Sequence, residues 1–248
     1  MARKKIIKWE PDNFQLQTNS VWSFPDRGNW ATHSSEYKGN WSPYIPRNLI
    51  LRYSSERDLL LDQFVGSGTT LIEAKLLKRN IIGVDINPKA LELCRKSTDF
   101  EREDCGQVII RQGDACNLDF IVDNSIDFLL THPPYANIIK YSDNIEKDLS
   151  HCEVKEFLEK MKQVAQESYR VLKKDKYCAI SMGDTRKKGY IIPISFNVMR
   201  VFEEAGFRLK ELIIKEQHNC SSTNYWKGKS IRCNFLLIAH EYLFVFKK

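Results

Sequence analysis

The sequence predicts an α/β protein in which a mainly parallel β-sheet carries helices on both faces. Short apolar runs, which are typical of buried strands, alternate along the chain with segments of helical periodicity. A glycine-rich turn, Val65-Gly66-Ser67-Gly68-Thr69-Thr70, joins the first of these runs to the first helical segment. Polar residues directly follow several of the runs, and open parallel sheets bind ligands beyond the carboxyl ends of their strands.

Residues 1–56 are irregular and contain four of the five tryptophans of the chain. This aromatic content predicts an arm or lid that wraps the core, contributes to the ligand site, and ends in a short helix near Pro46–Tyr53. Residues 57–248 are expected to form the main domain. Its first half is predicted to contain strands at Asp58–Phe64, Asn80–Asp85, Val108–Arg111 and Ser125–Thr131, and helices at Leu71–Lys78 and from Asn87 to about Lys96.

The second half of the main domain begins with a polar segment, residues 136–150, which is expected to be a mobile loop. Ser150 and Glu153 have the spacing of a capping box before a helix whose apolar residues continue to Val171. A proline near its start marks the next predicted helix. The remaining predictions are a strand at Tyr177–Met182, a helix at Pro193–Ala205, and terminal strands at about Phe207–Lys215 and Phe235–Phe246.

The composition is typical of a soluble globular protein, with 42% hydrophobic and 28% charged residues. No apolar run is long enough to span a bilayer, and the basic N-terminus lacks the apolar segment of a secretory signal. The seven cysteines include no C-x-x-C pair and have no zinc-like spacing. We therefore expect reduced thiols in a cytoplasmic protein, with neither a metal site nor a membrane contact.

The net charge of +6 is unevenly distributed along the chain. Residues 1–169 carry 22 Lys and Arg against 25 Asp and Glu, whereas residues 170–232 carry 14 against 6. A basic sector of this kind suits a polyanion, because Lys and Arg release counterions from phosphates. A solvated surface explains it equally well.

Two acidic residues near the glycine turn indicate the kind of ligand that this turn would hold. Asp62 precedes the turn, and Asp85 lies at the tip of the next strand, 23 residues later. The turn lacks both the full G-x-G-x-x-G pattern and the G-K-[ST] of phosphate loops, and the two acids would repel a pyrophosphate. They would instead accept an ammonium and a ribose diol, which favours S-adenosylmethionine. Asp114, after the third strand, could accept from an adenine amino group; a structural turn with surface acids is the alternative.

Thr131-His132-Pro133-Pro134-Tyr135 follows a buried strand and combines rigid backbone acceptors with a planar aromatic ring. Two consecutive prolines fix φ and remove two backbone donors. This combination suits a planar substrate group that bears an amino function. Tyr135 is expected to stack on that group, rather than to serve as a core aromatic, because the prolines place it in a loop.

The two motifs together resemble those of the amino-group DNA methyltransferases, which methylate N4 of cytosine or N6 of adenine. The segment from Asp62 to Thr70 is similar to the cofactor motif D-P-F-x-G-S-G-T-T, with Gln63 in place of proline. Gly83–Pro88 resembles the acidic ribose motif, and Thr131–Tyr135 resembles the catalytic [D/N/S]-P-P-[Y/F]. Trp41–Ile50, which includes Pro46, resembles the N-terminal motif that closes over the methionine end of the cofactor, and Ala239–Phe246 resembles the last strand.

The resemblance implies a Rossmann-like methyltransferase fold with a seven-stranded sheet, helices on both faces and an antiparallel C-terminal hairpin. It also implies S-adenosylmethionine as cofactor and double-stranded DNA as partner, with base flipping because a base inside a duplex cannot reach the cofactor. Such enzymes commonly serve restriction–modification systems, so a cognate restriction endonuclease is a candidate partner. The implied cofactor-binding residues are Asp62, Phe64, Gly66, Gly68, Thr69, Thr70, Asp85, Ile86, Asp114, Ala115 and Pro46, and the implied catalytic residues are Thr131, His132, Pro133, Pro134 and Tyr135.

His132 departs from the family pattern, which has Asp, Asn or Ser at this position. A neutral imidazole nitrogen can accept a hydrogen bond, whereas a protonated one cannot. One hypothesis is that neutral His132 accepts or relays the amino proton together with the Pro133 carbonyl. The other is that His132 only positions its neighbours.

The residues most suited to DNA are basic and lie after the catalytic motif. They are Arg186, Lys187, Lys188, Trp226, Lys227 and Lys229. An ordinary basic turn and hairpin is the alternative interpretation of both segments.

Three other functions stay open beside methylation of cytosine N4, which Thr131 with Pro-Pro-Tyr favours. The first is methylation of adenine N6, because the cofactor motif here precedes the catalytic one, the reverse of many cytosine-N4 enzymes. The second is methylation of an RNA amino group such as guanine N2. The third is a non-catalytic module that binds cofactor and nucleic acid.

Overall fold

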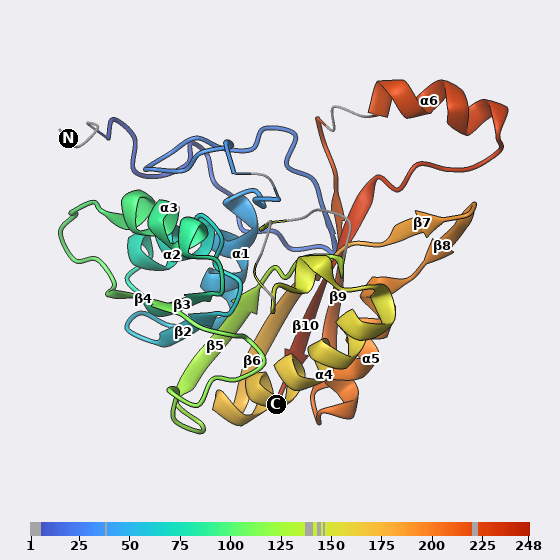
Figure 1. Cartoon of the computed structure of the whole chain (residues 1–248). Helices are drawn as coiled ribbons and strands as arrows, with labels where there is room; N and C mark the ends of the chain where they lie inside the picture. Colours follow the sequence, from blue (N-terminus) through green and yellow to red (C-terminus); the bar gives the residue numbers. More distant parts are fainter. Residues whose placement is uncertain (1–5, 38, 137–140, 143–144, 146, 220–222) are drawn as a thin grey trace.

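The centre of the molecule is an eight-stranded β-sheet with the strand order β1-β9-β10-β6-β5-β2-β3-β4 (Figure 1). The computed structural model describes residues 6–37, 39–136, 141–142, 145, 147–219 and 223–248. The sheet strands are β1 (Val21–Trp22), β2 (Leu59–Asp62), β3 (Asn80–Asp85), β4 (Val108–Gln112), β5 (Ile126–Thr131), β6 (Leu172–Met182), β9 (Arg208–Glu216) and β10 (His240–Lys247).

Strands β4, β3, β2, β5 and β6 are parallel, and β10 lies antiparallel between β6 and β9. This confirms the mainly parallel sheet and its antiparallel C-terminal pair of strands. The expected count of seven strands is corrected to eight, because Val21 and Trp22 pair in parallel with Ile214 and Lys215 at the edge of the sheet. A two-residue strand has no periodicity, so the sequence pattern gives no sign of it.

Helices cover both faces of the sheet, and neighbouring residues of one strand pack against opposite layers (Figure 1). Leu60 packs in the cluster that contains residues of helices α1 to α3, whereas Leu61 packs in the cluster that contains residues of α4 and α5. Phe128 and Leu129 divide between the two clusters in the same way. The helices are α1 (Tyr44–Tyr53), α2 (Thr69–Leu76), α3 (Pro88–Thr98), α4 (Val154–Val171) and α5 (Ile194–Glu204).

Two further elements project from the edge of the sheet where the parallel strands end. The hairpin β7–β8 (Thr185–Lys187 and Tyr190–Ile192) follows β6, and helix α6 (Thr223–Arg232) lies between β9 and β10 (Figure 1). An ordinary turn and hairpin was the alternative interpretation of the two basic segments; residues 185–192 do form a hairpin, whereas residues 223–232 form a helix. Its apolar residues do not face a core, so helical periodicity could not reveal it.

The capping box expected at the start of α4 is wrong. Glu153 is the N-cap and no side chain caps the helix, while the buried Ser150 accepts a hydrogen bond from the Tyr141 backbone N–H at 3.1 Å. Ser150 belongs instead to a 3-10 turn at Leu149–His151. The expected mobile loop, residues 136–150, falls partly outside the described residues, and its described positions 141 and 147–149 border the site below.

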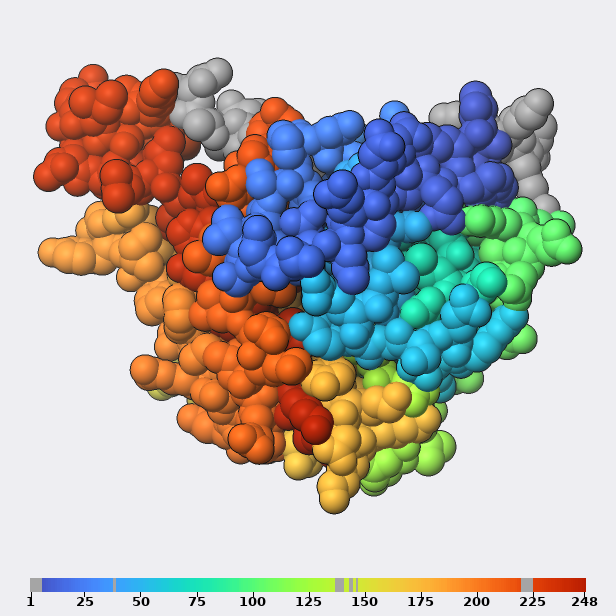
Figure 2. Space-filling view, turned by 180° about the vertical axis from the view of Figure 1, so that it is seen from behind, coloured from blue at the N-terminus to red at the C-terminus, as the bar shows by residue number. Residues whose placement is uncertain are grey.

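The N-terminal arm, residues 6–43, lies across α1 and α2 and forms much of one surface of the molecule (Figure 2). Its tryptophans Trp22, Trp30 and Trp41 are at most 5% exposed, so the arm packs as part of the core rather than as a detached flap.

Candidate active site

A cavity of about 810 Å³, its mouth included, lies at the carboxyl ends of β2 to β5. Most residues predicted for the cofactor line it: Asp62, Phe64, Gly66, Thr69, Thr70, Asp85, Ile86, Asp114 and Ala115. His132 and Pro134 of the acceptor loop, residues 131–135, line the same cavity. The structure therefore brings together the two motifs that lie about 70 residues apart in the sequence.

Two predicted cofactor residues do not line this cavity. Pro46 is buried within α1. Gly68 has φ +92° and caps α2, and a Cβ there would lie 2.8 Å from Cys94 Sγ. Gly68 therefore permits close packing of the turn on α3, whereas Gly66 faces the cavity.

Asp62 is a buried carboxylate at the base of the cavity. It accepts hydrogen bonds from the Phe64 backbone N–H at 3.1 Å and from the Thr131 hydroxyl at 2.9 Å. Burial raises its pKa to about 6, even though these bonds and the Thr70 hydroxyl lower it. No Lys or Arg among the described residues forms an ion pair with Asp62. A cationic ligand group placed here would restore the charged form of the carboxylate.

Asp85, the last residue of β3, links this strand to the glycine turn. Its two oxygens accept from the backbone N–H groups of Gly66 and Asn87, each at 2.9 Å. Burial raises the pKa of Asp85, and these backbone bonds oppose the rise. Each carboxylate oxygen retains a lone pair for a ligand hydroxyl. Asp114 at the next strand is partly exposed and accepts from the Cys116 backbone N–H at 2.9 Å.

The arm contributes a wall of the cavity through Asn40, a residue that was not among the predicted site residues. Asn40 Oδ1 accepts from the hydroxyls of Ser67 at 3.1 Å and Thr69 at 2.8 Å, so the arm is bonded directly to the glycine turn. Other lining residues outside the predicted motifs include Tyr37, Tyr141, Asp148 and Leu149, whereas Trp41 and Asn87 lie within motifs that resemble those of the family. The signals for the arm were its aromatic content and the Trp41–Ile50 motif, because irregular segments have no periodicity.

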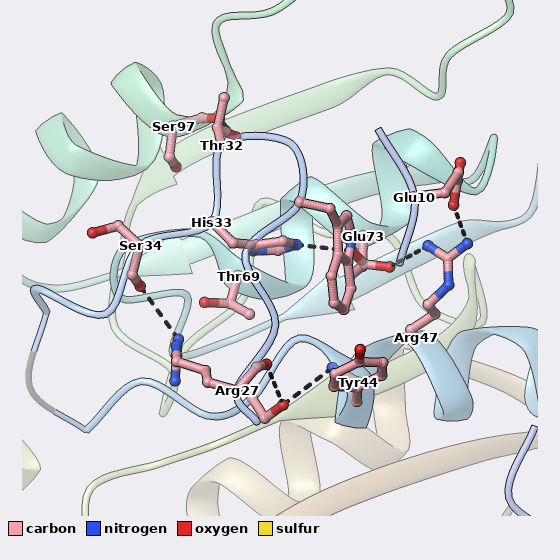
Figure 3. A network of polar contacts seen from close by, with 12 residues as sticks. Glu10, Arg27, Thr32, His33, Ser34, Tyr44, Arg47, Thr69, Glu73 and Ser97 are labelled. Carbon is pink, nitrogen blue, oxygen red and sulfur yellow. Dashed lines mark hydrogen bonds and ion pairs between the residues drawn. The ribbon is translucent and has the colours of Figure 1, made fainter. Parts of the chain in front are cut away.

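A buried network fixes the arm to α1 and α2 (Figure 3). Glu73, on α2 and 0% exposed, accepts from Trp30 Nε1 at 2.7 Å and from Arg47 of α1 at 2.9 Å, and it pairs with His33 Nε2 at 2.8 Å. Arg47 also bonds Glu10 of the arm. Because burying a charge without a partner is costly, the pairing fixes the arm at one place on the core.

The acceptor loop is partly buried and packs against aromatic rings. His132 lies face to face with Trp41, with ring centroids 5.2 Å apart and an interplanar angle of 18°. Its Nε2 forms a hydrogen bond of 2.5 Å with the Tyr135 hydroxyl. Burial lowers the pKa of His132 to about 4, although the Glu241 carboxylate opposes this change. The ring is therefore neutral at physiological pH, as the acceptor hypothesis requires.

Tyr135 packs closely against the end of β6. A Cβ on Gly183 would lie 2.7 Å from the Tyr135 ring, so a glycine is needed there. A second cavity, about 460 Å³, lies beside Tyr135, His132 and Pro133, and it is closed on the far side by Lys215 and Glu241. Thr131 lies in neither cavity; it is buried and supports Asp62.

The predicted DNA-facing residues lie on the two projecting elements. Arg186, Lys187 and Lys188 belong to the β7–β8 hairpin, and Trp226, Lys227 and Lys229 belong to α6. Arg186 donates to the Leu236 carbonyl at 3.0 Å and lies over the Phe235 ring, which links the hairpin to the segment after α6. Lys229 Nζ lies 4.7 Å from the Trp226 ring centroid.

Neither a metal cluster nor a membrane span is present in the part of the chain that the structure describes. No group of three or more His, Cys, Asp or Glu could hold a metal ion there. Likewise, none of its helices combines the length and the apolar character that crossing a bilayer requires.

The fold is that of the S-adenosylmethionine-dependent methyltransferases. A methyltransferase of this class from Methanosarcina mazei matches with a TM-score of 0.56 at 16% identity, over 81% of this chain and 96% of that one. TrmN from Thermus thermophilus matches with a TM-score of 0.57 at 17% identity, over 85% of this chain and 50% of that one. A general methyltransferase-domain family also matches residues 62–134.

The chain belongs to the DNA methylase family, whose sequence model matches residues 2–96 and 126–248. The type II methyltransferase M2.DpnII of Streptococcus pneumoniae is 43% identical over 60 residues, which are 24% of this chain and 22% of that protein. M.BglI of Bacillus subtilis is 30% identical over 102 residues, 38% of this chain and 29% of that protein. A tRNA (guanine(10)-N2)-dimethyltransferase of Methanothermobacter thermautotrophicus is 35% identical over 107 residues, 40% and 29% of the two chains. The chain thus spans less than a third of the length of these relatives.

Proposed function

We propose that the protein transfers a methyl group from S-adenosylmethionine to an exocyclic amino group of a DNA base. The observation that carries this proposal is the cavity with Asp62 and Asp85 at its base, which opens onto the Pro133-Pro134-Tyr135 loop. Membership in the DNA methylase family supports the choice of DNA.

The residues of the first cavity fit the parts of this cofactor. Asp62, whose pKa is raised to about 6 by burial, would pair with the α-ammonium group. Asp85 retains lone pairs for the ribose hydroxyls, and Asp114 with Ala115 would border the adenine. When bound, the cofactor supplies an electrophilic methyl group on a sulfonium.

The acceptor loop would prepare the amino nitrogen, whose lone pair is otherwise delocalised into the ring. The Pro133 carbonyl would accept one amino hydrogen and so favour a tetrahedral nitrogen. In the transfer the nitrogen would bond to the methyl carbon, the sulfonium sulfur would keep the electron pair of the broken carbon–sulfur bond, and one amino proton would pass to water. His132, with its Nε2 bonded to Tyr135, would hold the aromatic ring in place rather than relay this proton.

Base flipping would place the target in the second cavity, and the two projecting elements would hold the duplex. The hairpin β7–β8 and helix α6 carry basic residues beyond the same edge of the sheet as the cavities (Figure 1). Lys and Arg there would contact phosphates, and the partly exposed Trp226 offers a stacking surface.

Within this function we favour cytosine N4, on the Thr131 and Pro-Pro-Tyr pattern, with adenine N6 as the alternative. Methylation of guanine N2 in tRNA is a second candidate, which the similarity to the archaeal tRNA enzyme supports. A cognate restriction endonuclease is a proposed partner, because type II methyltransferases are among the relatives.

Labelled-methyl transfer from S-adenosylmethionine to unmethylated DNA, compared with tRNA, tests the proposal. We expect label in DNA, and an Asp85→Ala variant to transfer none. Nucleoside mass spectrometry of the product, with modification mapping of DNA from cells that express the protein, would give the base and its sequence context. Cofactor binding without transfer to any nucleic acid would contradict the proposal.

A further inference from the structure

The second cavity shares one wall with the first. Gly39, Asn40, Trp41, His132 and Tyr141 line both cavities. Only the second cavity is bordered by Lys215 and Glu241, which lie on neighbouring strands of the sheet. This pair forms part of the space that faces the acceptor loop.

Lys215 and Glu241 are paired by the register of the sheet. They lie directly opposite each other on the antiparallel strands β9 and β10, and Lys215 Nζ lies 3.0 Å from Glu241 Oε2. Gln217 Nε2 donates to Glu241 Oε1 at 3.0 Å. The side chains of Lys215 and Glu241 are only 16% and 11% exposed.

The carboxylate stays charged in spite of its burial. Burial is the largest single effect and opposes its ionisation, but Lys215, His132 and the hydrogen bond from Gln217 together outweigh it, and the pKa of Glu241 is lowered. Lys215 and Gln217 each donate to one of the two oxygens, and the Tyr135 hydroxyl also interacts with this carboxylate. The two oxygens have about four lone-pair sites, so acceptor capacity remains for a ligand. The cavity thus presents a charged acceptor beside a charged donor.

The acceptor loop itself contains no anionic side chain. The position at which the family has Asp, Asn or Ser holds His132, whose Nε2 is bonded to the Tyr135 hydroxyl. Pro133, Pro134 and the stacked Trp41 offer no side-chain acceptor. Glu241 is the anionic group among the described residues that line the second cavity.

We propose that Glu241 and Lys215 recognise the amino-bearing edge of the target base, an inference that rests on the proposed function. The Glu241 carboxylate accepts a hydrogen of the exocyclic amino group, and the Lys215 ammonium donates to the adjacent unprotonated ring nitrogen. Cytosine (N4 and N3) and adenine (N6 and N1) both present this donor–acceptor edge. The edge in question is the Watson–Crick edge, on which guanine has two neighbouring donors, N1–H and N2–H, so that the ammonium finds no acceptor beside the amino group. Guanine pairs its amino group with an unprotonated ring nitrogen, N3, only on the opposite, sugar edge.

A charge-neutralising double variant separates this role from a merely structural ion pair. The variants are Glu241→Gln, Lys215→Met and the two combined, with the exposed ion pair Lys210–Glu211 of the same strand as control (Lys210→Met with Glu211→Gln). A structural pair predicts that removing both charges together restores activity, because each single variant leaves one buried charge unpaired. Recognition of the base predicts that the double variant stays as slow as the slower single variant.

The measurements are labelled-methyl transfer to unmethylated DNA and calorimetric binding of S-adenosylhomocysteine. We expect Glu241→Gln to lower kcat by at least about 10-fold. Its affinity for S-adenosylhomocysteine should change less than about twofold. Lys215→Met is expected to raise KM for DNA and to lower kcat, and the control pair is expected to match the unaltered protein.

The outcomes distinguish the inference from the proposed function. Transfer to DNA by the unaltered protein, with equal rates in Glu241→Gln or recovery in the double variant, overturns the inference alone. Transfer to RNA only contradicts DNA as substrate, and the same variants on RNA then decide the inference. A guanine product contradicts it directly, and no transfer to either nucleic acid overturns both proposals.

Discussion

At the scale of single residues, the site depends on buried groups whose ionisation differs from that in water. Asp62 and His132 line the same cavity, yet burial shifts their pKa values in opposite directions, to about 6 and about 4. Both shifts favour the neutral form, because burial penalises charge. The cavity is thus poorly suited to free charges and well suited to a ligand that brings its own cation.

Replacing Asp62 with Asn should stabilise the protein and weaken cofactor binding. The folded-state pKa of Asp62 is raised, so its ionisation destabilises the folded state as the pH rises from about 4 to about 6. Above pH 6 the variant should gain up to about 3 kcal/mol in the free energy of unfolding. Chemical denaturation at pH 8 and calorimetry with S-adenosylhomocysteine measure both effects. The control is Asp119→Asn, which changes an exposed carboxylate. Unchanged cofactor affinity in Asp62→Asn would refute the proposed pairing of Asp62 with the α-ammonium group.

The pH profile should reflect Asp62 rather than His132. A protonated Asp62 cannot pair with the α-ammonium group, so kcat/KM for S-adenosylmethionine should fall about tenfold per pH unit below about 6. The proposed ammonium partner would lower the pKa of Asp62 in the complex, and burial lowers the pKa of His132 to about 4, so kcat should stay level to about pH 5. Steady-state rates between pH 5 and 8 test this. A limb in kcat near 6.5 that disappears in His132→Asn would show instead that His132 titrates during catalysis.

At the scale of elements, the parallel strands gather the chemistry and the additions to the sheet supply the surface around it. Strands β2, β3, β4 and β5 each end at the first cavity, whereas β9 and β10 border the second. The hairpin β7–β8 and helix α6 extend beyond the same edge (Figure 1). The residues proposed for catalysis and those proposed to bind DNA thus lie on different elements at the same edge of the sheet.

Removing basic residues from the projecting elements should weaken DNA binding without affecting the cofactor. Each of the double variants Lys187→Ala/Lys188→Ala and Lys227→Ala/Lys229→Ala should lower the slope of log affinity against log salt by about 1 to 2, because each lost phosphate contact contributes about 0.9. Fluorescence anisotropy with a labelled duplex between 50 and 200 mM salt, a range chosen to resolve slopes of this order, gives the slope.

The control removes two lysines at the opposite end of the sheet. Lys174 and Lys210 lie near the starts of β6 and β9, far from the cavities. The control variant Lys174→Ala/Lys210→Ala should keep the slope of the unaltered protein. Equal losses in control and test variants would mean that net charge, rather than these elements, determines the affinity.

At the scale of the whole molecule, the arm and the main domain form one packed unit. The family model begins at residue 2, and the arm supplies Asn40 and Trp41 to the wall between the two cavities. Glu73 lies on α2, the helix that follows the glycine turn. It accepts hydrogen bonds from Trp30 of the arm and from Arg47 of α1. Anchoring of the arm and the shape of the cofactor cavity are therefore coupled.

Arg47→Ala should destabilise the fold and weaken cofactor binding together. It leaves the fully buried Glu73 without its arginine, a change that typically costs about 3–5 kcal/mol, or roughly 6–20 °C in Tm for a chain of this size. Differential scanning calorimetry and binding of S-adenosylhomocysteine measure the two effects. Arg102→Ala removes the other, more exposed partner of Glu10 and should change the stability by at most about 1 kcal/mol. A fall in Tm with unchanged cofactor affinity would argue against the coupling.

The sequence by itself determined the strands, the glycine turn and the acids at the strand ends. Strand β3 lies at Asn80–Asp85 as predicted, and Asn87 caps α3, because apolar runs and cap residues act locally. The carboxyl ends of parallel strands meet at one edge of the sheet. Asp62, Asp85 and the acceptor loop could therefore be predicted to lie close together.

Only the tertiary structure decided which distant segments complete the site. The arm that provides Asn40 and Trp41, the two-residue strand β1, and the opposition of Lys215 to Glu241 depend on contacts between residues up to almost 200 positions apart. Irregular segments and strand register have no local pattern, because the partner that stabilises them lies elsewhere in the chain. The acceptor loop was therefore visible in the sequence, whereas the carboxylate and ammonium that face it became visible only in the folded sheet.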